Sequence, residues 1–239
     1  MLSRDYLYIS GESATNPTSA VIVLPEIFGP TDSIKRVADR FAKEFGMLGA
    51  VLDHFYSVSE KSEVFDYQTG REAGFALMQQ EKGADFLELF NTAVSELMAE
   101  YPTLEEIVVC GFCFGGRLSY VAATNMNVKK VISFYGAGAN QPDFNKDKSA
   151  IQSVVDARSN DEALRIMSFY GAQDGSIAPD DRLHTRSLLT QANIEYIEKV
   201  YPTGHAYFNE DRETYHEASA IASWQDIEKF MAAAEEDFS

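Results

Sequence analysis

A cysteine stands between two glycines in residues 111–115 (Gly-Phe-Cys-Phe-Gly), directly after the apolar run 107–109. Glycines two residues before and after a nucleophile are typical of a sharp turn from a strand into a helix, most often with serine at its centre. The glycines let strand and helix approach closely, and the nucleophile is exposed in a strained backbone conformation. A thiol at a helix N-terminus is also favoured as thiolate. The spacing therefore predicts that Cys113 is a nucleophile; a glycine-rich turn around a buried thiol is the alternative.

An aspartate and a histidine follow this cysteine in the order that a hydrolytic triad uses. Residues 165–170 are predicted to be a strand with Asp174 in the loop after it, and residues 195–201 a strand followed by His205. The carboxyl ends of parallel strands meet at the edge where open α/β sheets bind ligands. We therefore predict that Cys113 attacks a carbonyl, His205 relays the proton, and Asp174 holds the imidazole. The alternatives are a turn-capping Asp174 and a loop histidine without a role.

The elements that must position these residues alternate between strand and helix. Strands are predicted over 20–24, 48–53, 107–109, 130–135, 165–170 and 195–201, and helices over 34–45, 71–80, 84–99, 114–125, 151–157, 180–191 and 215–234. Such alternation predicts an α/β fold with a mostly parallel, doubly wound sheet and helices on both faces. A length of 239 residues suits one such domain over residues 1–239. The polar stretch 136–162 is a candidate lid or surface excursion.

Four segments resemble the dienelactone hydrolase family, from about residue 21 to residue 230 of the chain. They are residues 25–29 (Pro-Glu-Ile-Phe-Gly), 111–116 (Gly-Phe-Cys-Phe-Gly-Gly), 171–174 (Gly-Ala-Gln-Asp) and 204–209 (Gly-His-Ala-Tyr-Phe-Asn). The resemblance implies an α/β-hydrolase fold. It also implies a carboxymethylenebutenolidase-like activity, in which the cysteine opens an unsaturated lactone.

The resemblance implies roles for residues outside the triad. The backbone N–H of Phe114, the residue after the nucleophile, would form an oxyanion hole with that of Ile27. Glu26 would contact the resting cysteine and swing away when substrate binds; a carboxylate at the end of a buried strand needs a partner, and a solvent-facing one is the alternative. Arg71, at a predicted helix start, would bind a substrate carboxylate, with a solvated surface charge as the alternative.

Two positions depart from the pattern of the lactone-specific members. Asn209 stands four residues after His205, where those members carry a second arginine, and Arg212 is near but not equivalent. Phe75 stands where a tyrosine that contacts substrate is expected. The hydrolytic machinery is therefore complete, whereas the dienelactone substrate does not follow from the resemblance.

Composition excludes several classes of partner. The formal net charge is −17 and the isoelectric point is near 4.6, so nucleic acid and anionic membrane surfaces are not expected partners. No basic-then-apolar N-terminus and no apolar run near the ~18 residues of a membrane helix is visible. Two cysteines provide no disulfide framework, which favours a cytoplasmic location. We expect a small ester or lactone substrate, no cofactor, and a monomer or small homo-oligomer.

Two other classes of function stay open. Cys110 and Cys113 have the C-x-x-C spacing of thiol redox proteins, although Cys110 falls within the predicted strand, where it is expected to be a small buried hydrophobe pointing away from Cys113. A catalytically silent relative that only binds a ligand is the second, although it would not need all three triad residues. The histidines lack metal-ligand spacing and are predicted to be surface residues without a metal, namely His54, His184, His205 and His216.

Overall fold

One seven-stranded sheet forms the centre of the protein. The computed structural model describes residues 5–142 and 148–232. The strand order is β1-β3-β2-β4-β5-β6-β7, and every pairing is parallel except that of β1 with β3. The strands are β1 (Leu7–Ile9), β2 (Ser19–Leu24), β3 (Leu48–Leu52), β4 (Glu106–Phe112), β5 (Val128–Phe134), β6 (Arg165–Gly171) and β7 (Glu195–Tyr201). The predicted mostly parallel sheet is confirmed.

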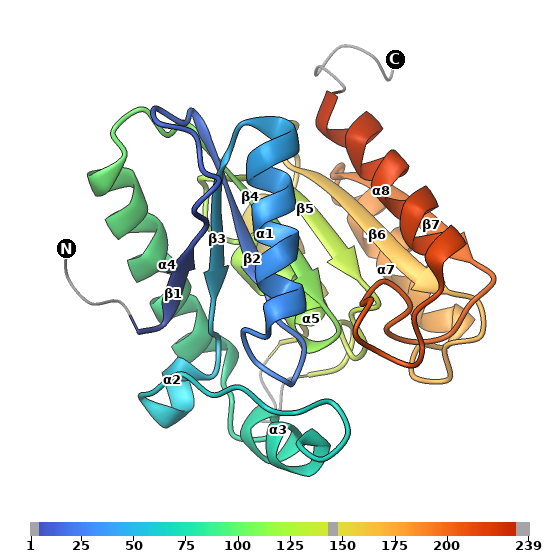
Figure 1. Cartoon of the computed structure of the whole chain (residues 1–239). Coiled ribbons are helices and arrows are strands. Elements are labelled where there is room, and N and C mark those ends of the chain that lie inside the picture. The colour runs from blue at the N-terminus through green and yellow to red at the C-terminus, as the bar shows by residue number, and fades with distance from the viewer. Residues whose placement is uncertain (1–4, 143–147, 233–239) are drawn as a thin grey trace.

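Helices cover both faces of this sheet. They are α1 (Asp32–Phe45), α2 (Tyr56–Ser59), α3 (Arg71–Met78), α4 (Gly83–Glu100), α5 (Phe114–Ala122), α6 (Ala150–Arg158), α7 (Pro179–Gln191) and α8 (Glu217–Ala232). Figure 1 shows α1 and α8 in front of the sheet and α4 and α5 behind it. Along β2, Val21 and Val23 pack in the cluster with α1 and α8, and Ile22 and Leu24 in the cluster with α4 and α5. None of the helices among the described residues is both long and apolar enough to cross a membrane.

Most predicted elements are present, with differences at ends and in short elements. The sequence did not predict β1 or α2, which have three and four residues. The helix predicted over 114–125 ends at Ala122, since residues 123–125 form a turn. The helix predicted over 215–234 begins at Glu217, because the His216 ring accepts a hydrogen bond from the N–H of Ser219 in the first turn. The last two residues of that prediction lie outside the described residues.

The candidate lid over 136–162 includes α6, whereas residues 143–147 lie outside the described part. Arg158 at the end of α6 is buried and donates hydrogen bonds to the carbonyls of Ala123, Asn125 and Val128. The second half of the stretch is therefore anchored near the amino end of β5. This is the end of the strand opposite to the edge that carries the predicted triad.

The carboxyl edge of the sheet gathers the chemically interesting residues. Each follows a different strand directly or by a short loop: Glu26 follows β2, Cys113 follows β4, Tyr135 follows β5, Asp174 follows β6 and His205 follows β7. Figure 1 shows this edge at the bottom of the view, with α2 and α3 beyond it. Five loops from parallel neighbours thus build one site, as open α/β sheets do.

Candidate active site

Cys113 occupies the turn between β4 and α5 in a strained conformation. Its φ is 53° and its ψ is −113°, and it is the N-cap residue of α5. The turn is fixed on both sides, since Cys113 N–H donates to the carbonyl of Phe134 at 3.0 Å and its own carbonyl accepts from Arg117 N–H at 3.1 Å. A positive φ at a residue other than glycine costs on the order of 1–3 kcal/mol and is common at functional sites. The geometry is that of a nucleophile turn.

The two glycines are required by close backbone contacts. A Cβ on Gly111 would lie 2.1 Å from the carbonyl oxygen of Gly115, so β4 and α5 could not meet. A Cβ on Gly115 would lie 2.2 Å from the carbonyl oxygen of Leu24 at the end of β2. Gly115 N–H also donates to the carbonyl of Pro25 at 3.0 Å. The nucleophile turn therefore packs directly on the loop that carries Glu26.

The carboxylate of Asp174 holds the ring of His205. Nδ1 of His205 lies 2.7 Å from Oδ2 of Asp174, and Oδ1 accepts from the N–H of Ser176 at 2.8 Å. Because a carboxylate only accepts, Nδ1 carries the hydrogen and Nε2 is left for another partner. Burial raises the pKa of Asp174, but its hydrogen bond to His205 and the other bonds outweigh burial and hold it below its usual range.

His205 lies between two acidic groups. Burial lowers the pKa of His205, but the neighbouring Cys113 and the hydrogen bond to Asp174 raise it, to about 10 overall. The ring is 26% exposed and packs against Tyr135 at a centroid distance of 5.0 Å. The structure therefore brings the three residues that the sequence predicted as a triad into one hydrogen-bonded cluster. The raised pKa of His205 favours a protonated imidazolium ring at neutral pH.

The two predicted oxyanion donors lie in the nucleophile turn and in the loop that packs on it. Phe114 is the first residue of α5, so its N–H has no acceptor within the helix. Ile27 lies in the turn that Gly29 N–H closes on the carbonyl of Glu26 at 3.2 Å. Helix α3 also packs on the turn that contains Ile27. A Cβ on Gly74 in α3 would lie 2.1 Å from the Ile27 carbonyl oxygen. The turn around Ile27 is thus held between the nucleophile turn and α3.

Glu26 is a buried carboxylate with partners on one oxygen. It is 1% exposed, so the alternative of a solvent-facing carboxylate is wrong. Its Oε2 accepts from Nδ2 of Asn209 at 3.1 Å and from Nη1 of Arg212 at 3.4 Å. Burial raises the pKa of Glu26, and Arg212 and Asn209 oppose that rise. Within the described residues, Oε1 of Glu26 has no hydrogen-bond partner.

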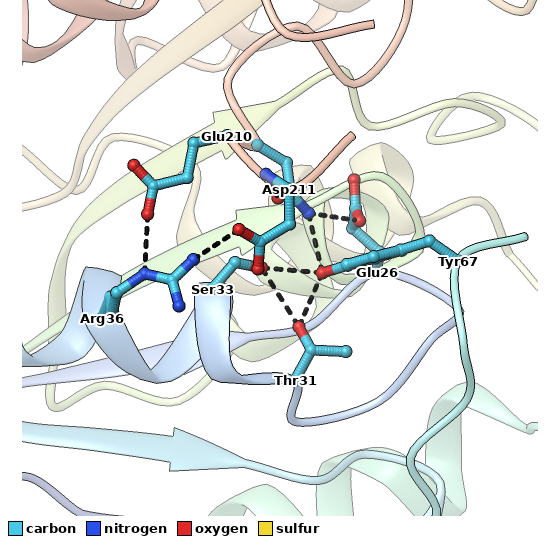
Figure 2. A network of polar contacts seen from close by, with 8 residues as sticks. Glu26, Thr31, Ser33, Arg36, Tyr67, Glu210 and Asp211 are labelled. Atoms are coloured by element: carbon cyan, nitrogen blue, oxygen red, sulfur yellow. Dashed lines mark hydrogen bonds and ion pairs between the residues drawn. The ribbon is translucent and has the colours of Figure 1, made fainter. Parts of the chain in front are cut away.

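A network of polar side chains supports the partners of Glu26 (Figure 2). Asn209 also donates from Nδ2 to the hydroxyl of Tyr67 at 2.8 Å. That hydroxyl lies 2.7 Å from the hydroxyls of both Thr31 and Ser33, at the start of α1. Three distant segments, around residues 31, 67 and 209, therefore converge on one carboxylate.

A second set of contacts ties the loop after His205 to α1. Arg36 donates from Nε to Glu210 at 2.6 Å and from Nη2 to Asp211 at 2.7 Å (Figure 2). Asp211 N–H donates in turn to Oδ1 of Asn209 at 3.1 Å. These charges are exposed, so each pair contributes little to stability, on the order of 1 kcal/mol or less. Their effect is to restrict the loop that carries Asn209.

Two residues at this site were not predicted from sequence. Tyr135 is fully buried at a φ of 39°, and among residues 5–142 and 148–232 its hydroxyl has no hydrogen-bond partner. Burial, followed by the neighbouring Glu26, raises its pKa well above the usual range. Its signal was its place as the last residue of the strand predicted over 130–135. Tyr67 had no signal, because its part depends on contacts with α1 and the loop of Asn209.

Two arginines, Arg71 and Arg212, bear on the prediction of a carboxylate-binding residue. Arg71 begins α3 as predicted and is exposed, with its guanidinium 5.3 Å from the ring centre of Phe75. A guanidinium not predicted from the sequence contacts Glu26. It belongs to Arg212, which lies over the rings of Phe28 and Tyr67 at 4.9 and 5.4 Å. The sequence noted Arg212 only as a neighbour of Asn209.

Cys110 and His54 are both fully buried. Cys110 lies in the apolar layer within β4, and burial raises its pKa well above the usual range, which disfavours a redox role. The prediction that His54 is a surface histidine is wrong, because its ring packs between Phe55 and Phe114. In the described parts of the chain, no three His, Cys, Asp or Glu side chains are grouped as metal ligands would be.

Comparisons with known proteins show which family this chain is similar to. Residues 5–235 match the sequence model described as "Dienelactone hydrolase family". A protein of Synechocystis sp. named "Putative carboxymethylenebutenolidase" is 29% identical over 235 residues, covering 94% of this chain and 89% of its own length. One of the same name from Escherichia coli is 27% identical over 216 residues, covering 90% and 76%. The crystal structure of a "Putative Dienelactone Hydrolase" from Klebsiella pneumoniae superimposes with a TM-score of 0.79 at 26% identity, covering 95% and 92%.

Proposed function

This chain belongs to the dienelactone hydrolase family, and from that premise we propose that it hydrolyses small esters or lactones through an acyl-enzyme on Cys113. The observation that carries the proposal is the His205–Asp174 pair beside a strained cysteine at the N-terminus of α5. Relatives named as carboxymethylenebutenolidases support a lactone among the substrates. The single sheet with its two core layers supports residues 1–239 as one catalytic domain, and a cytoplasmic location stays a prediction.

The first step is attack by the thiolate. An imidazolium on His205 stabilises a thiolate on Cys113, and so does the N-terminus of α5. The sulfur forms a bond to the carbonyl carbon, and the π electrons of the C=O bond move to oxygen. The resulting oxyanion accepts hydrogen bonds from the N–H groups of Ile27 and Phe114. One such donor is worth about 10²- to 10³-fold in kcat.

The second step breaks the ester bond. The oxyanion collapses, the C–O bond to the alcohol breaks, and the leaving oxygen takes a proton from Nε2 of His205. The acyl group stays on Cys113 as a thioester. Asp174 keeps Nδ1 protonated throughout, so that Nε2 faces the reaction. In a lactone the new hydroxyl remains attached to the acyl group.

The third step releases the acid. Nε2 of His205, now without its proton, accepts one from a water molecule whose oxygen attacks the thioester carbon. The C–S bond breaks, the carboxylic acid leaves, and the thiolate and imidazolium are restored. No atom of the protein is consumed in the cycle.

Two further residues are proposed to affect substrate selectivity and the activation of the Cys113 thiol. Arg71 lies one helical turn before Gly74, which packs on the Ile27 turn, and we propose that it attracts a carboxylate on the substrate. Glu26 is proposed to alternate between Cys113 and its partners Asn209 and Arg212. Its raised pKa and its unpartnered Oε1 support a carboxyl group that can change partners.

A cysteine-to-serine variant tests the proposal. Cys113→Ser is expected to fold but to lose more than about 100-fold in kcat/KM for short activated esters, because an alcohol needs more help from the base than a thiolate does. Iodoacetamide should label Cys113, as peptide mapping would show, and block turnover. Cys110→Ala is the matched control and should keep activity. Equal turnover in the serine variant would show that thiol chemistry is not needed, and labelling confined to Cys110 would show that Cys113 is not the reactive thiol. If the wild type hydrolyses none of a set of short activated esters, the protein is a catalytically silent relative that only binds a ligand.

A further inference from the structure

A second pair of carboxylate and imidazole lies buried behind the candidate oxyanion hole. His54 follows β3 and Glu81 precedes α4, and their side chains are 0% and 1% exposed. Nδ1 of His54 lies 3.6 Å from Oε2 of Glu81. The steps proposed above do not use either residue. Two buried polar side chains so close to the site call for a physical account.

The outer atoms of the pair are both bonded. Nε2 of His54 lies 3.2 Å from the carbonyl oxygen of Pro25, and Oε1 of Glu81 accepts from the hydroxyl of Ser57 at 2.6 Å. A carbonyl oxygen only accepts, so Nε2 carries a hydrogen and donates it to Pro25. The direction of this bond is therefore fixed by chemistry.

The inner atoms, Nδ1 of His54 and Oε2 of Glu81, face each other. Neither has a hydrogen-bond partner elsewhere in the part of the chain that the structure describes. These two buried polar atoms therefore lie in close contact without a hydrogen bond, and Glu81 supports the His54 ring on its Nδ1 side.

The carbonyl of Pro25 is the point where this pair meets the nucleophile turn. It accepts a second hydrogen bond, from Gly115 N–H at 3.0 Å. The ring of His54 also packs edge-on against that of Phe114 at a centroid distance of 5.2 Å. His54 therefore contacts both segments that carry the proposed oxyanion donors: the loop of Ile27, two residues beyond Pro25, and the first residue of α5.

We propose that His54, backed by Glu81, is a positioning residue for the oxyanion hole. Its hydrogen bond fixes the carbonyl of Pro25 and thereby the backbone N–H of Ile27 relative to that of Phe114. The inference rests on the proposed function, since it assumes that an oxyanion forms on Cys113. A misplacement of about 1 Å in a catalytic geometry costs on the order of 100-fold in rate, so loss of this bond would reduce kcat while leaving KM nearly unchanged.

Two polar variants of similar bulk separate this role from a general effect on folding. In His54→Gln the side-chain amide nitrogen reaches about as far as Nε2 and can still donate to Pro25. In His54→Asn the amide is too short to reach Pro25 and stands near the place of Nδ1. We expect kcat near the wild-type value for His54→Gln and a loss of about 10- to 100-fold for His54→Asn.

Two probes of Cys113 identify which property has changed. A trifluoromethyl ketone adds to the thiolate and forms an oxyanion, so its affinity should fall in His54→Asn by the same factor as kcat. Iodoacetamide alkylates the thiolate without forming an oxyanion, and its rate should be the same in wild type and both variants. Glu81→Gln keeps an acceptor for Ser57 and should have a smaller effect than His54→Asn.

Three results would overturn the inference. Wild-type ketone affinity in His54→Asn would show that the bond to Pro25 does not matter. Equal losses in His54→Gln and His54→Asn would show that the donor is not the reason. A parallel fall in the rate of alkylation would place the effect on the thiol instead of the oxyanion hole. The proposed function is tested separately in the wild type, where ester turnover that survives alkylation of Cys113 would overturn both.

Discussion

Two pairs of carboxylate and imidazole in the described part of the chain differ in the partner of the second ring nitrogen, Nε2. In Asp174–His205 the contact is a hydrogen bond of 2.7 Å, and the ring is partly exposed beside Cys113. In Glu81–His54 the closest atoms are 3.6 Å apart, the ring is fully buried, and Nε2 meets a backbone carbonyl. The same two side-chain types can therefore move protons in one place and hold a backbone in another. The partner of Nε2 and the access of water decide which.

The surroundings of the two carboxyl groups, Asp174 and Glu81, differ in the same way as those of the two rings. Asp174 accepts from His205 and from the N–H of Ser176, so it stays ionised and orients the ring. Glu81 has one oxygen on Ser57 and the other facing His54 without a hydrogen bond in the described residues. A pair whose histidine gains and loses a proton during turnover needs the arrangement of Asp174 and His205. The carboxylate of Asp174 then has hydrogen-bond donors whether the imidazole is protonated or neutral.

Amide variants of the two acids should give the largest difference between the pairs. Asp174→Asn presents a hydrogen to Nδ1 of His205 and forces the wrong tautomer, so we expect kcat to fall by about 10³- to 10⁴-fold. Glu81→Gln should cost less than about 10-fold, since it changes only the support of a positioning residue. The measurement is kcat for one activated ester, with thermal unfolding as the control for folding. Equal losses in both variants would contradict the division of roles.

A smaller effect is expected from the two arginines near the site. Arg71→Ala should reduce the ratio of kcat/KM for acidic over neutral esters by roughly 10-fold, the lower end of a charge-assisted contact, because Arg71 is exposed. Arg212→Gln removes the guanidinium from buried Glu26 and should lower the free energy of unfolding by about 1–3 kcal/mol. Matched ester pairs and chemical denaturation measure the two quantities. An unchanged ester ratio in Arg71→Ala would remove the carboxylate anchor and leave a general short-chain esterase.

A further expected effect is a dependence of stability on pH that is specific to His205. Its pKa is about 10 in the folded protein and 6.5 when unperturbed. A raised pKa contributes stability that is complete below pH 6.5 and is lost as the pH rises toward 10. Tm of the wild type should therefore fall toward that of His205→Gln across this window. A constant difference in Tm between the two proteins would mean that the imidazolium contributes nothing to folding.

The residues that the sequence could predict are those whose signal is local. Cys113 lies in a five-residue pattern, and Asp174 and His205 each follow a predicted strand within four residues. Because parallel strands end at one edge, three local signals were enough to predict one cluster. The same reasoning applied to His54, which directly follows the strand predicted over 48–53, but the absence of metal-ligand spacing was taken to mean a surface position.

Other parts of the site depend on contacts between distant segments. Tyr67 accepts a hydrogen bond from Asn209, which is 142 residues away in the sequence, and Arg212 donates one to Glu26, which is 186 residues away. No periodicity or short pattern marks such contacts. Likewise β1 is too short for a reliable alternation and is a strand only because it pairs with β3 at the edge of the sheet. Packing, not local preference, determines these features.

The central claim is that the acyl group passes through Cys113. The most direct test is to mix the protein with a short activated ester, quench with acid during turnover, and map the acylated peptide by mass spectrometry. The account predicts one acyl group on the peptide that contains Cys113, bound as a thioester that hydroxylamine removes, and a longer lifetime of this species in His205→Gln. Acylation of another residue, or steady turnover of the ester by Cys113→Ala, would contradict it.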